Sequence, residues 1–76
     1  MNKIYERKIK EVKFEQGEYE MFVNVKYDDS DNFEKLFSYY DDEISFTEDE
    51  LIGLTEIEAY NLKHDKDLYY LQHDIL

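Results

Sequence analysis

The chain has 76 residues, a net charge of −11 from 20 acids and nine bases, and no cysteine. A chain of this length forms one domain that buries only about 60% of its unfolded surface, so its core is small. The composition excludes disulfides and thiolate metal sites, and two histidines, His64 and His73, cannot form a zinc site alone. Stability must therefore come from eight tyrosines and five phenylalanines, or from a partner, which is either a second copy of the chain or another protein.

The charge is distributed unevenly along the chain. Residues 1–13 carry five bases and two acids, whereas residues 14–76 carry four bases and 18 acids. Such a surface repels nucleic acid and anionic membranes and attracts basic grooves, so we expect neither of the first two as a partner. No apolar run approaches the roughly 18 residues of a membrane span, and no apolar segment of the signal-peptide kind follows the basic start. These features predict a cytoplasmic protein.

The first half of the chain predicts strands. Residues 3–14 are typical of a strand in which Val12 and Phe14 share one face, and EQGE at 15–18 is typical of a short turn. The clearest alternation follows, and it predicts a half-buried strand. The side chains that it directs to the core are Tyr19, Met21, Val23, Val25 and Tyr27.

A third strand completes the predicted sheet. The polar segment DDSDN, residues 28–32, favours a tight turn. Residues 33–40 then predict another strand, which in a longer version reaches Phe46. Three strands joined by short turns predict an antiparallel meander over residues 1–46.

After Phe46 the spacing of apolar residues changes from the alternation of a strand to the spacing of a helix. Thr47 to Glu50 and Thr55 to Glu58 each have the spacing of a capping box, and Gly53 is suited to end the first helix after about one turn. The second helix is predicted from Glu56 to about His64. The residues that suggest a last helix, separate from the second or continuous with it, are Leu68, Tyr69, Leu71 and Ile75. We therefore expect one α+β domain over 1–76, with a small antiparallel three-stranded sheet followed by two or three short helices (47–76) packed on one face.

Metal binding and catalysis are not indicated. Asp28, Ser30 and Asn32 have the first spacings of a calcium loop, but Phe33 and Tyr39 stand where glycine and glutamate are required. The chain has no cysteine nucleophile, no glycine-rich phosphate loop and no H-E-x-x-H motif. A sheet of this size also leaves little room for a catalytic cleft. We expect no enzyme activity, no metal and no cofactor.

The acids invite two interpretations. In the first interpretation, the acids of the predicted first helical turns complement the helix dipole, and the other acids serve solubility alone. Alternatively, carboxylates about 6.6 Å apart on a strand imitate a phosphate backbone, and tyrosines among them occupy pockets that accept bases. Because neighbouring residues of a strand point to opposite faces, only one of Tyr39 and Tyr40 can contact a partner. The predicted partner-binding residues are Asp28, Asp29, Asp31, Tyr39, Tyr40, Asp41, Asp42, Glu43, Glu48, Asp49 and Glu50.

Two segments carry resemblances to known proteins. GLTEIEAYNLKHDKDLYYLQ, residues 53–72, resembles the ends of small uncharacterised proteins from phages of Gram-positive bacteria. FSYYDDEISFTEDELIGLT, residues 37–55, is similar to the small phage inhibitors of uracil-DNA glycosylase, which resemble DNA and insert a phenylalanine from a short helix into the enzyme. The corresponding place here is held by Glu48 or Asp49, and Phe46 precedes the helix.

The chain also resembles anti-CRISPR proteins directed against Cas9-type nucleases, which are small, acidic, α+β and free of cofactors. This resemblance implies a phage-derived inhibitor that blocks the nucleic-acid groove of a host defence nuclease by DNA mimicry. Two alternatives remain open: an inhibitor of uracil-DNA glycosylase, and a structural or regulatory phage protein whose acids confer only solubility. The implied partner is a basic DNA- or RNA-binding host protein, met in the bacterial cytoplasm.

Overall fold

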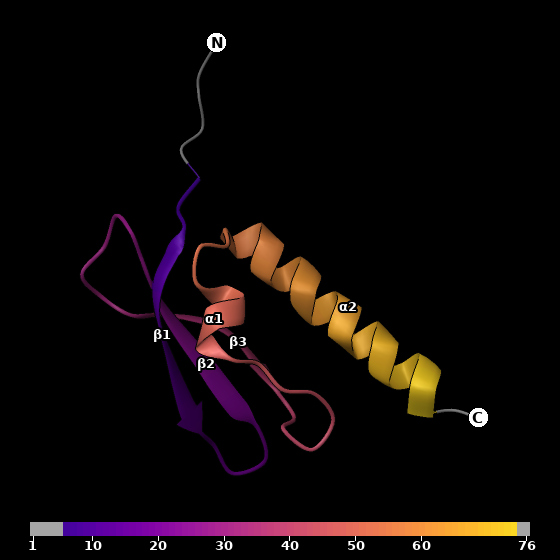
Figure 1. Ribbon diagram of the computed structural model, residues 1–76. Helices are drawn as coiled ribbons and strands as arrows, with labels where there is room; N and C mark the ends of the chain where they lie inside the picture. Colours follow the sequence, from indigo (N-terminus) through magenta and orange to yellow (C-terminus); the bar gives the residue numbers. More distant parts are fainter. Residues whose placement is uncertain (1–5, 75–76) are drawn as a thin grey trace.

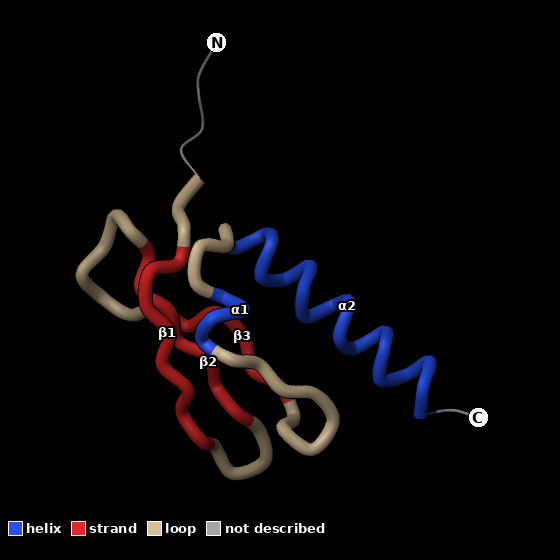
Figure 2. The backbone as a smooth tube through the Cα atoms, in the orientation of Figure 1, coloured by secondary structure: helices blue, strands red, loops and turns tan. Residues whose placement is uncertain are grey.

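The computed structural model describes residues 6–74, which form a three-stranded sheet and two helices (Figure 1). The elements follow in the order β1 (Ile9–Gln16), β2 (Met21–Tyr27), β3 (Glu34–Tyr39), α1 (Glu48–Leu51) and α2 (Glu56–Asp74). The sheet is antiparallel with strand order β1-β2-β3, and the helices follow it in the chain (Figure 2). The predicted α+β fold with an antiparallel meander is confirmed. No helix within residues 6–74 is long and apolar enough to cross a membrane.

The core face of the sheet follows the predicted alternation over β2. Val23 and Val25 are fully buried, Tyr27 is buried and Met21 is half-buried against them. Val12 pairs with Val25 and Phe14 with Val23, so these two β1 residues share the core face as predicted. The register shifts between Ile9 and Glu11, so an extra β1 residue lies there. A bulge of this kind lets Ile9 and Val12, three residues apart, both turn inward.

The prediction for Tyr19 is wrong, because its side chain is 77% exposed. β1 runs to Gln16, beyond the predicted end, and the turn comes later than expected. The Gly17 amide donates to the Glu20 carbonyl across 2.8 Å, which places Tyr19 at the tip of the turn and outside the ladder. A Cβ on Gly17 would lie 2.5 Å from the Phe22 ring, so the turn requires glycine here. Alternation alone cannot locate the point at which a strand gives way to its turn.

β3 is shorter than predicted and also contains a register shift. It ends at Tyr39, and residues 40–46 form a loop instead of an extension of the strand. The shift lies opposite Val23 and Asn24, and it allows the consecutive residues Leu36 and Phe37 both to be buried. β3 therefore contributes more apolar surface to the core than strict alternation allows.

Both capping boxes predicted for the helices are present. Thr47 caps α1, with its hydroxyl accepting from the Glu50 amide and the Glu50 carboxylate accepting from the Thr47 amide. Thr55 and Glu58 form the same reciprocal pair at the start of α2, at 3.2 and 2.9 Å. Gly53 has a φ of 93°, the left-handed conformation expected after the short helix.

The second and last predicted helices are one continuous helix of 19 residues, α2. The segment HDKD, residues 64–67, breaks the apolar spacing but remains helical. His64 and Asp65 are exposed, and Lys66 and Asp67 are each half-buried in an ion pair. Lys63 and Asp67 form an i,i+4 ion pair across this segment at 2.8 Å. The predicted short helix is present as α1, and of the two alternatives for the rest of the chain the continuous helix is the one present, as the long α2. Ile75, which was expected in this helix, lies outside the described residues.

One cluster of buried side chains joins the sheet to both helices. The start of β1 is held between β2 and the α1–α2 connection, where the Ile9 amide donates to the Leu54 carbonyl and the Gly53 amide donates to the Ile9 carbonyl, each at 2.8 Å. The buried apolar residues are Ile9, Val12, Val23, Val25, Tyr27, Leu36, Phe37, Tyr39, Phe46, Leu51 and Ala59. Because residues from the strands and both helices all pack into this cluster, the helices cover the same face of the sheet.

We predict that Val23→Asp unfolds the protein, whereas Asn24→Asp leaves it folded. The two neighbours point to opposite faces, and only Val23 is fully buried. An unpaired buried carboxylate costs several kcal/mol against a total stability of about 5 kcal/mol for a domain of this size. Urea unfolding followed by circular dichroism measures both variants. A Val23→Asp variant as stable as Asn24→Asp would contradict the assigned core face.

Candidate functional site

The loop that follows β3 carries the acid and aromatic residues of the candidate site. The Tyr40 carbonyl accepts from the Glu43 and Ile44 amides at 3.0 and 3.1 Å, which closes a tight turn over Asp41 and Asp42. Tyr40 is 52% exposed, whereas the preceding Tyr39 is buried. The expected division of the two tyrosines is therefore present, with Tyr40 as the one that a partner can reach. We call residues 40–43 the acidic loop.

An aromatic cluster supports the acidic loop from below. The ring of Phe46 lies 5.0 Å from that of Tyr39, edge to face, and 5.2 Å from that of Phe37. Burial raises the pKa of Tyr39 above its ordinary value. Tilted and edge-to-face pairs of this kind each stabilise the fold by about 0.5–1.5 kcal/mol, in addition to the stabilisation from the apolar area that they bury. The loop thus leaves the sheet at Tyr39 and returns to the core at Phe46.

Lys66, on α2, fastens the other side of the loop. Its ammonium donates to the Ser45 carbonyl at 2.7 Å and to the Glu50 carboxylate at 2.8 Å, and it lies 4.6 Å from the centre of the Phe46 ring. The hydrogen bond from Lys66 holds the pKa of Glu50 below its ordinary value. A single cation therefore ties α2 to the acidic loop's exit and to α1.

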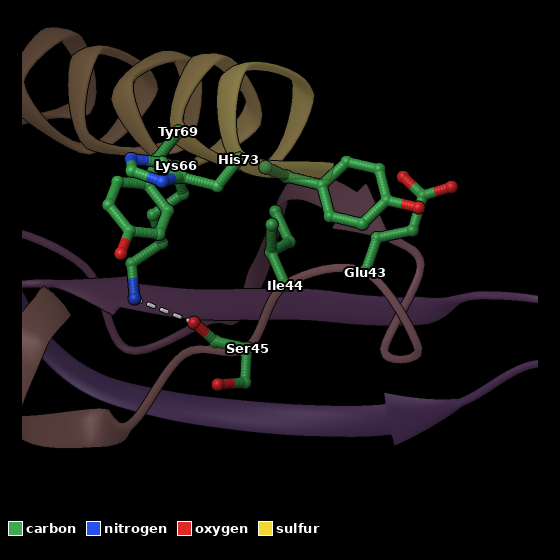
Figure 3. Close-up of a pocket in the computed structure, with 7 residues that line it drawn as sticks. Glu43, Ile44, Ser45, Lys66, Tyr69 and His73 are labelled. Carbon is green, nitrogen blue, oxygen red and sulfur yellow. Dashed lines mark hydrogen bonds between the residues drawn. The ribbon is translucent and has the colours of Figure 1, made fainter. Parts of the chain in front are cut away.

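A hollow of about 400 Å³ separates the loop from the second half of α2 (Figure 3). Ile44 points into it from the loop, and Tyr69 and His73 reach down from the helix, with Glu43 at the outer end. The rings of Tyr69 and His73 lie 3.9 Å apart, so the helix presents a stacked pair at this edge. The lining of the hollow thus combines aromatic side chains and Lys66 of α2 with the acid Glu43 of the loop.

The three acids of the acidic loop form no ion pair within the described part of the chain. No lysine, arginine or histidine among residues 6–74 forms an ion pair with Asp41, Asp42 or Glu43. The same holds, across the described part of the chain, for Glu48 and Asp49 on α1, which are exposed. Of the predicted α1 acids, only Glu50 is engaged, by Lys66. The loop and α1 together therefore present negative charge to solvent without internal compensation.

The turn of Asp28, Asp29 and Asp31 lies elsewhere. It begins at the end of β2, whereas the acidic loop begins at the end of β3, so the antiparallel hairpin places them at opposite ends of the sheet (Figure 2). The length of β3 separates them by about 20 Å. The predicted partner-binding residues thus fall into two groups that no single small contact can join.

Arg7 neutralises part of the charge of this distant turn. Its guanidinium donates to Asp29 at 2.7 Å and to Glu34, and both contacts raise the pKa of Arg7. It also lies 4.2 Å from the centre of the Tyr27 ring, and burial raises the pKa of Tyr27 to about 12. Asp28 accepts from the Lys8 amide at 3.4 Å, so two of the three aspartates here have internal donors. These contacts give the turn an ordinary structural role.

The lysines of the sheet lie on the face away from the helices. Lys26 is placed over the Phe33 ring at 4.9 Å and pairs with Glu11 at 3.2 Å, and Lys35 is placed over the Phe22 ring at 4.8 Å. These strand positions alternate with the buried valines of β2, so they point outward. The acidic loop and the lysines of the sheet are therefore segregated onto different faces.

The residues that position the site were not identified from the sequence. Lys66 falls in the HDKD segment, which looks only like an interruption of the apolar pattern, and its partners Ser45 and Glu50 are 21 and 16 residues away. Arg7 was counted only as part of the basic N-terminal region. An available signal was the position of Lys66 on the same helical face as Ala59 and Leu62, which pack on the core.

Comparisons with known proteins identify no relative of this chain. No protein-family model, curated protein sequence or solved structure matches this chain. The function must therefore be argued from the site itself.

We predict that Lys66→Met lowers stability at neutral pH by about 1–2 kcal/mol, because it removes a hydrogen bond and an incompletely buried ion pair. The folded pKa of Glu50 lies below its ordinary 4.5, so the ion pair contributes above that pH and is lost as pH falls through the lowered value. Urea unfolding at neutral and acid pH should therefore show a smaller acid-induced loss in the variant. The control Lys63→Met removes only the exposed pair with Asp67. Equal pH dependence in parent and Lys66→Met would contradict the assignment.

We predict that the fold needs no metal. No cluster of three or more metal-binding side chains occurs within residues 6–74. Dialysis against a chelator should leave the circular dichroism spectrum and the melting temperature unchanged. A loss of structure that calcium or zinc restores would contradict this prediction.

Proposed function

We propose that the protein is an acidic inhibitor that occupies the nucleic-acid-binding groove of a basic DNA- or RNA-acting protein. The observation that carries the proposal is the acidic loop, in which exposed Tyr40 adjoins Asp41, Asp42 and Glu43, and none of these acids pairs with a cation of residues 6–74. Like charges that face solvent side by side repel one another, and a basic groove relieves that repulsion on binding. The tyrosine supplies a ring for a pocket that otherwise receives a base.

The way in which the loop is held supports this role. Ordering a loop on binding costs affinity, and a loop that is already ordered avoids this cost. Here Tyr39 and Phe46 fix both ends in the core, and Lys66 fastens the exit. The acids of α1 extend the same negative surface, because α1 starts two residues after Phe46. The functional residues are therefore Tyr40, Asp41, Asp42, Glu43, Glu48 and Asp49, whereas Tyr39 and Glu50 position them.

A Cas9-type nuclease is the first target to test, because its groove holds both DNA and guide RNA and is basic over a large area. Inhibition of uracil-DNA glycosylase by an inserted phenylalanine has less support. The short helix α1 contains no phenylalanine, and the adjacent Phe46 is buried beneath the loop. If the acids serve solubility alone, substitutions in the acidic loop should affect binding to a partner no more than substitutions of other surface acids.

We predict that neutralising the loop with Asp41→Asn, Asp42→Asn and Glu43→Gln slows association with a basic nuclease, because long-range charge sets encounter rates. Tyr40→Ala should instead speed dissociation, since an aromatic anchor acts at short range. Surface plasmon resonance at several salt concentrations measures both rates, and binding should weaken as salt rises. The pair Asp28→Asn with Asp31→Asn is the control for the pair Asp41→Asn with Asp42→Asn, since it removes the same charge at the far end of the sheet.

Competition decides whether the protein occupies the groove. Guide RNA or target DNA should displace the protein from the nuclease, and the protein should displace nucleic acid. Simultaneous binding of both to one nuclease would contradict groove occupation. Equal losses from the loop and the control substitutions would show that net charge alone is responsible.

A further inference from the structure

The outward face of α2 carries an apolar stripe that the core does not use. Ile57 is 70% exposed, Leu71 51% and Leu68 41%, and His64 between them is also exposed. At 100° per residue these four positions fall within an arc of about 60°. They lie opposite the side of the helix that packs on the sheet, which presents Ala59, Leu62 and Lys66. We call Ile57, His64, Leu68 and Leu71 the α2 stripe.

The stripe is symmetric along the helix. Ile57 and Leu71 each lie seven residues from His64, in opposite directions, and Tyr60 and Leu68 each lie four residues from it. Tyr60 borders the stripe, 44% exposed, with its hydroxyl donating to the Leu36 carbonyl at 2.9 Å. A two-fold interface requires that residue i contact residue j while j contacts i. This palindrome satisfies that condition for two antiparallel helices that cross at His64.

We propose that the α2 stripe is a homodimer interface, in which two α2 helices pack antiparallel with His64 on the two-fold axis. Ile57 then packs on Leu71 of the second copy and Tyr60 on Leu68. This inference stands apart from the inhibitor function, because the acidic loop lies on the inner side of α2, next to the hollow. A dimer leaves that loop accessible and presents it twice.

The charges beside the stripe set the strength of the pairing. On one flank the antiparallel register brings Lys63 of each copy within about 3 Å, along the axis, of Asp67 of the other. On the other flank Asp65 approaches its own counterpart, and each copy carries −11 overall. The net repulsion is long-range, so salt screens it. Dimerisation should therefore strengthen as salt rises, whereas binding to a basic groove weakens.

Sedimentation equilibrium over a range of protein concentrations tests the proposal. The parent should dimerise, with a dissociation constant that falls between low salt and about 0.5 M NaCl. Leu68→Glu should raise that constant about tenfold or more, because it places a charge in the apolar contact. Ile52→Glu is the matched control, since it adds the same charge at an exposed apolar residue outside α2. It should dimerise as the parent does.

Cysteine cross-linking tests the register without relying on a disruptive variant, because the chain has no native cysteine. His64→Cys should form a disulfide-linked dimer, and the off-stripe Tyr69→Cys should not. Helices about 8–10 Å apart place facing Cα atoms within disulfide range. A mixture of Ile57→Cys and Leu71→Cys should cross-link to each other, and neither should cross-link alone.

Three results would overturn the proposal. A parent that remains monomeric at every concentration and salt, with no His64→Cys dimer, would remove the interface. Ile57→Cys chains that cross-link alone would show parallel packing. A monomer whose binding to a basic nuclease is lost in Leu68→Glu would assign the stripe to that partner.

Discussion

The ammonium of Lys66 is the contact on which the arrangement of the site depends. The sheet and α1 share a conventional core, but the second half of α2 places few apolar side chains against it, and Lys66 supplies the connection by bonding to Ser45 and Glu50 above the Phe46 ring. Without that contact the loop still packs on the aromatic rings of the core, but it loses its hydrogen bond to α2. The cost of partly burying the Lys66 ammonium is offset by its hydrogen bonds to the Glu50 carboxylate and the Ser45 carbonyl.

The distribution of charge follows from the fold. Lys26 and Lys35 lie at outward positions of the sheet, each over a phenylalanine ring, and Arg7 pairs with Asp29 of the β2–β3 turn and with Glu34 of β3. Within the described part of the chain, the acids that form no ion pair include those of the acidic loop and the first two residues of α1. Residues 40–50 carry six acids and no base, so more than half of the net charge of −11 is concentrated in this one region. Net charge favours a basic partner in general, and the segregation of charge favours a particular surface.

Much of the fold follows from local patterns. The β2 alternation, both capping boxes and the left-handed Gly53 depend on residues close in sequence, and the structure contains all of them. The bulges and the position of the Gly17 turn do not follow, because register is decided by packing between strands. The division of Tyr39 from Tyr40 was predictable from strand geometry. The roles of Lys66 and Arg7 were not, because their partners lie 16 to 27 residues away. Likewise, the α2 stripe emerges only once one knows which face of the helix the core occupies.

The central claim is that the acidic loop and α1 form the surface that meets a basic partner. Amide hydrogen exchange of the protein, alone and bound to a Cas9-type nuclease, tests it most directly. Exchange at residues 40–50 should slow in the complex, with no change at the 28–32 turn at the opposite end of the sheet. Protection confined to the 28–32 turn or to the outer face of the sheet, with residues 40–50 unchanged, would contradict it.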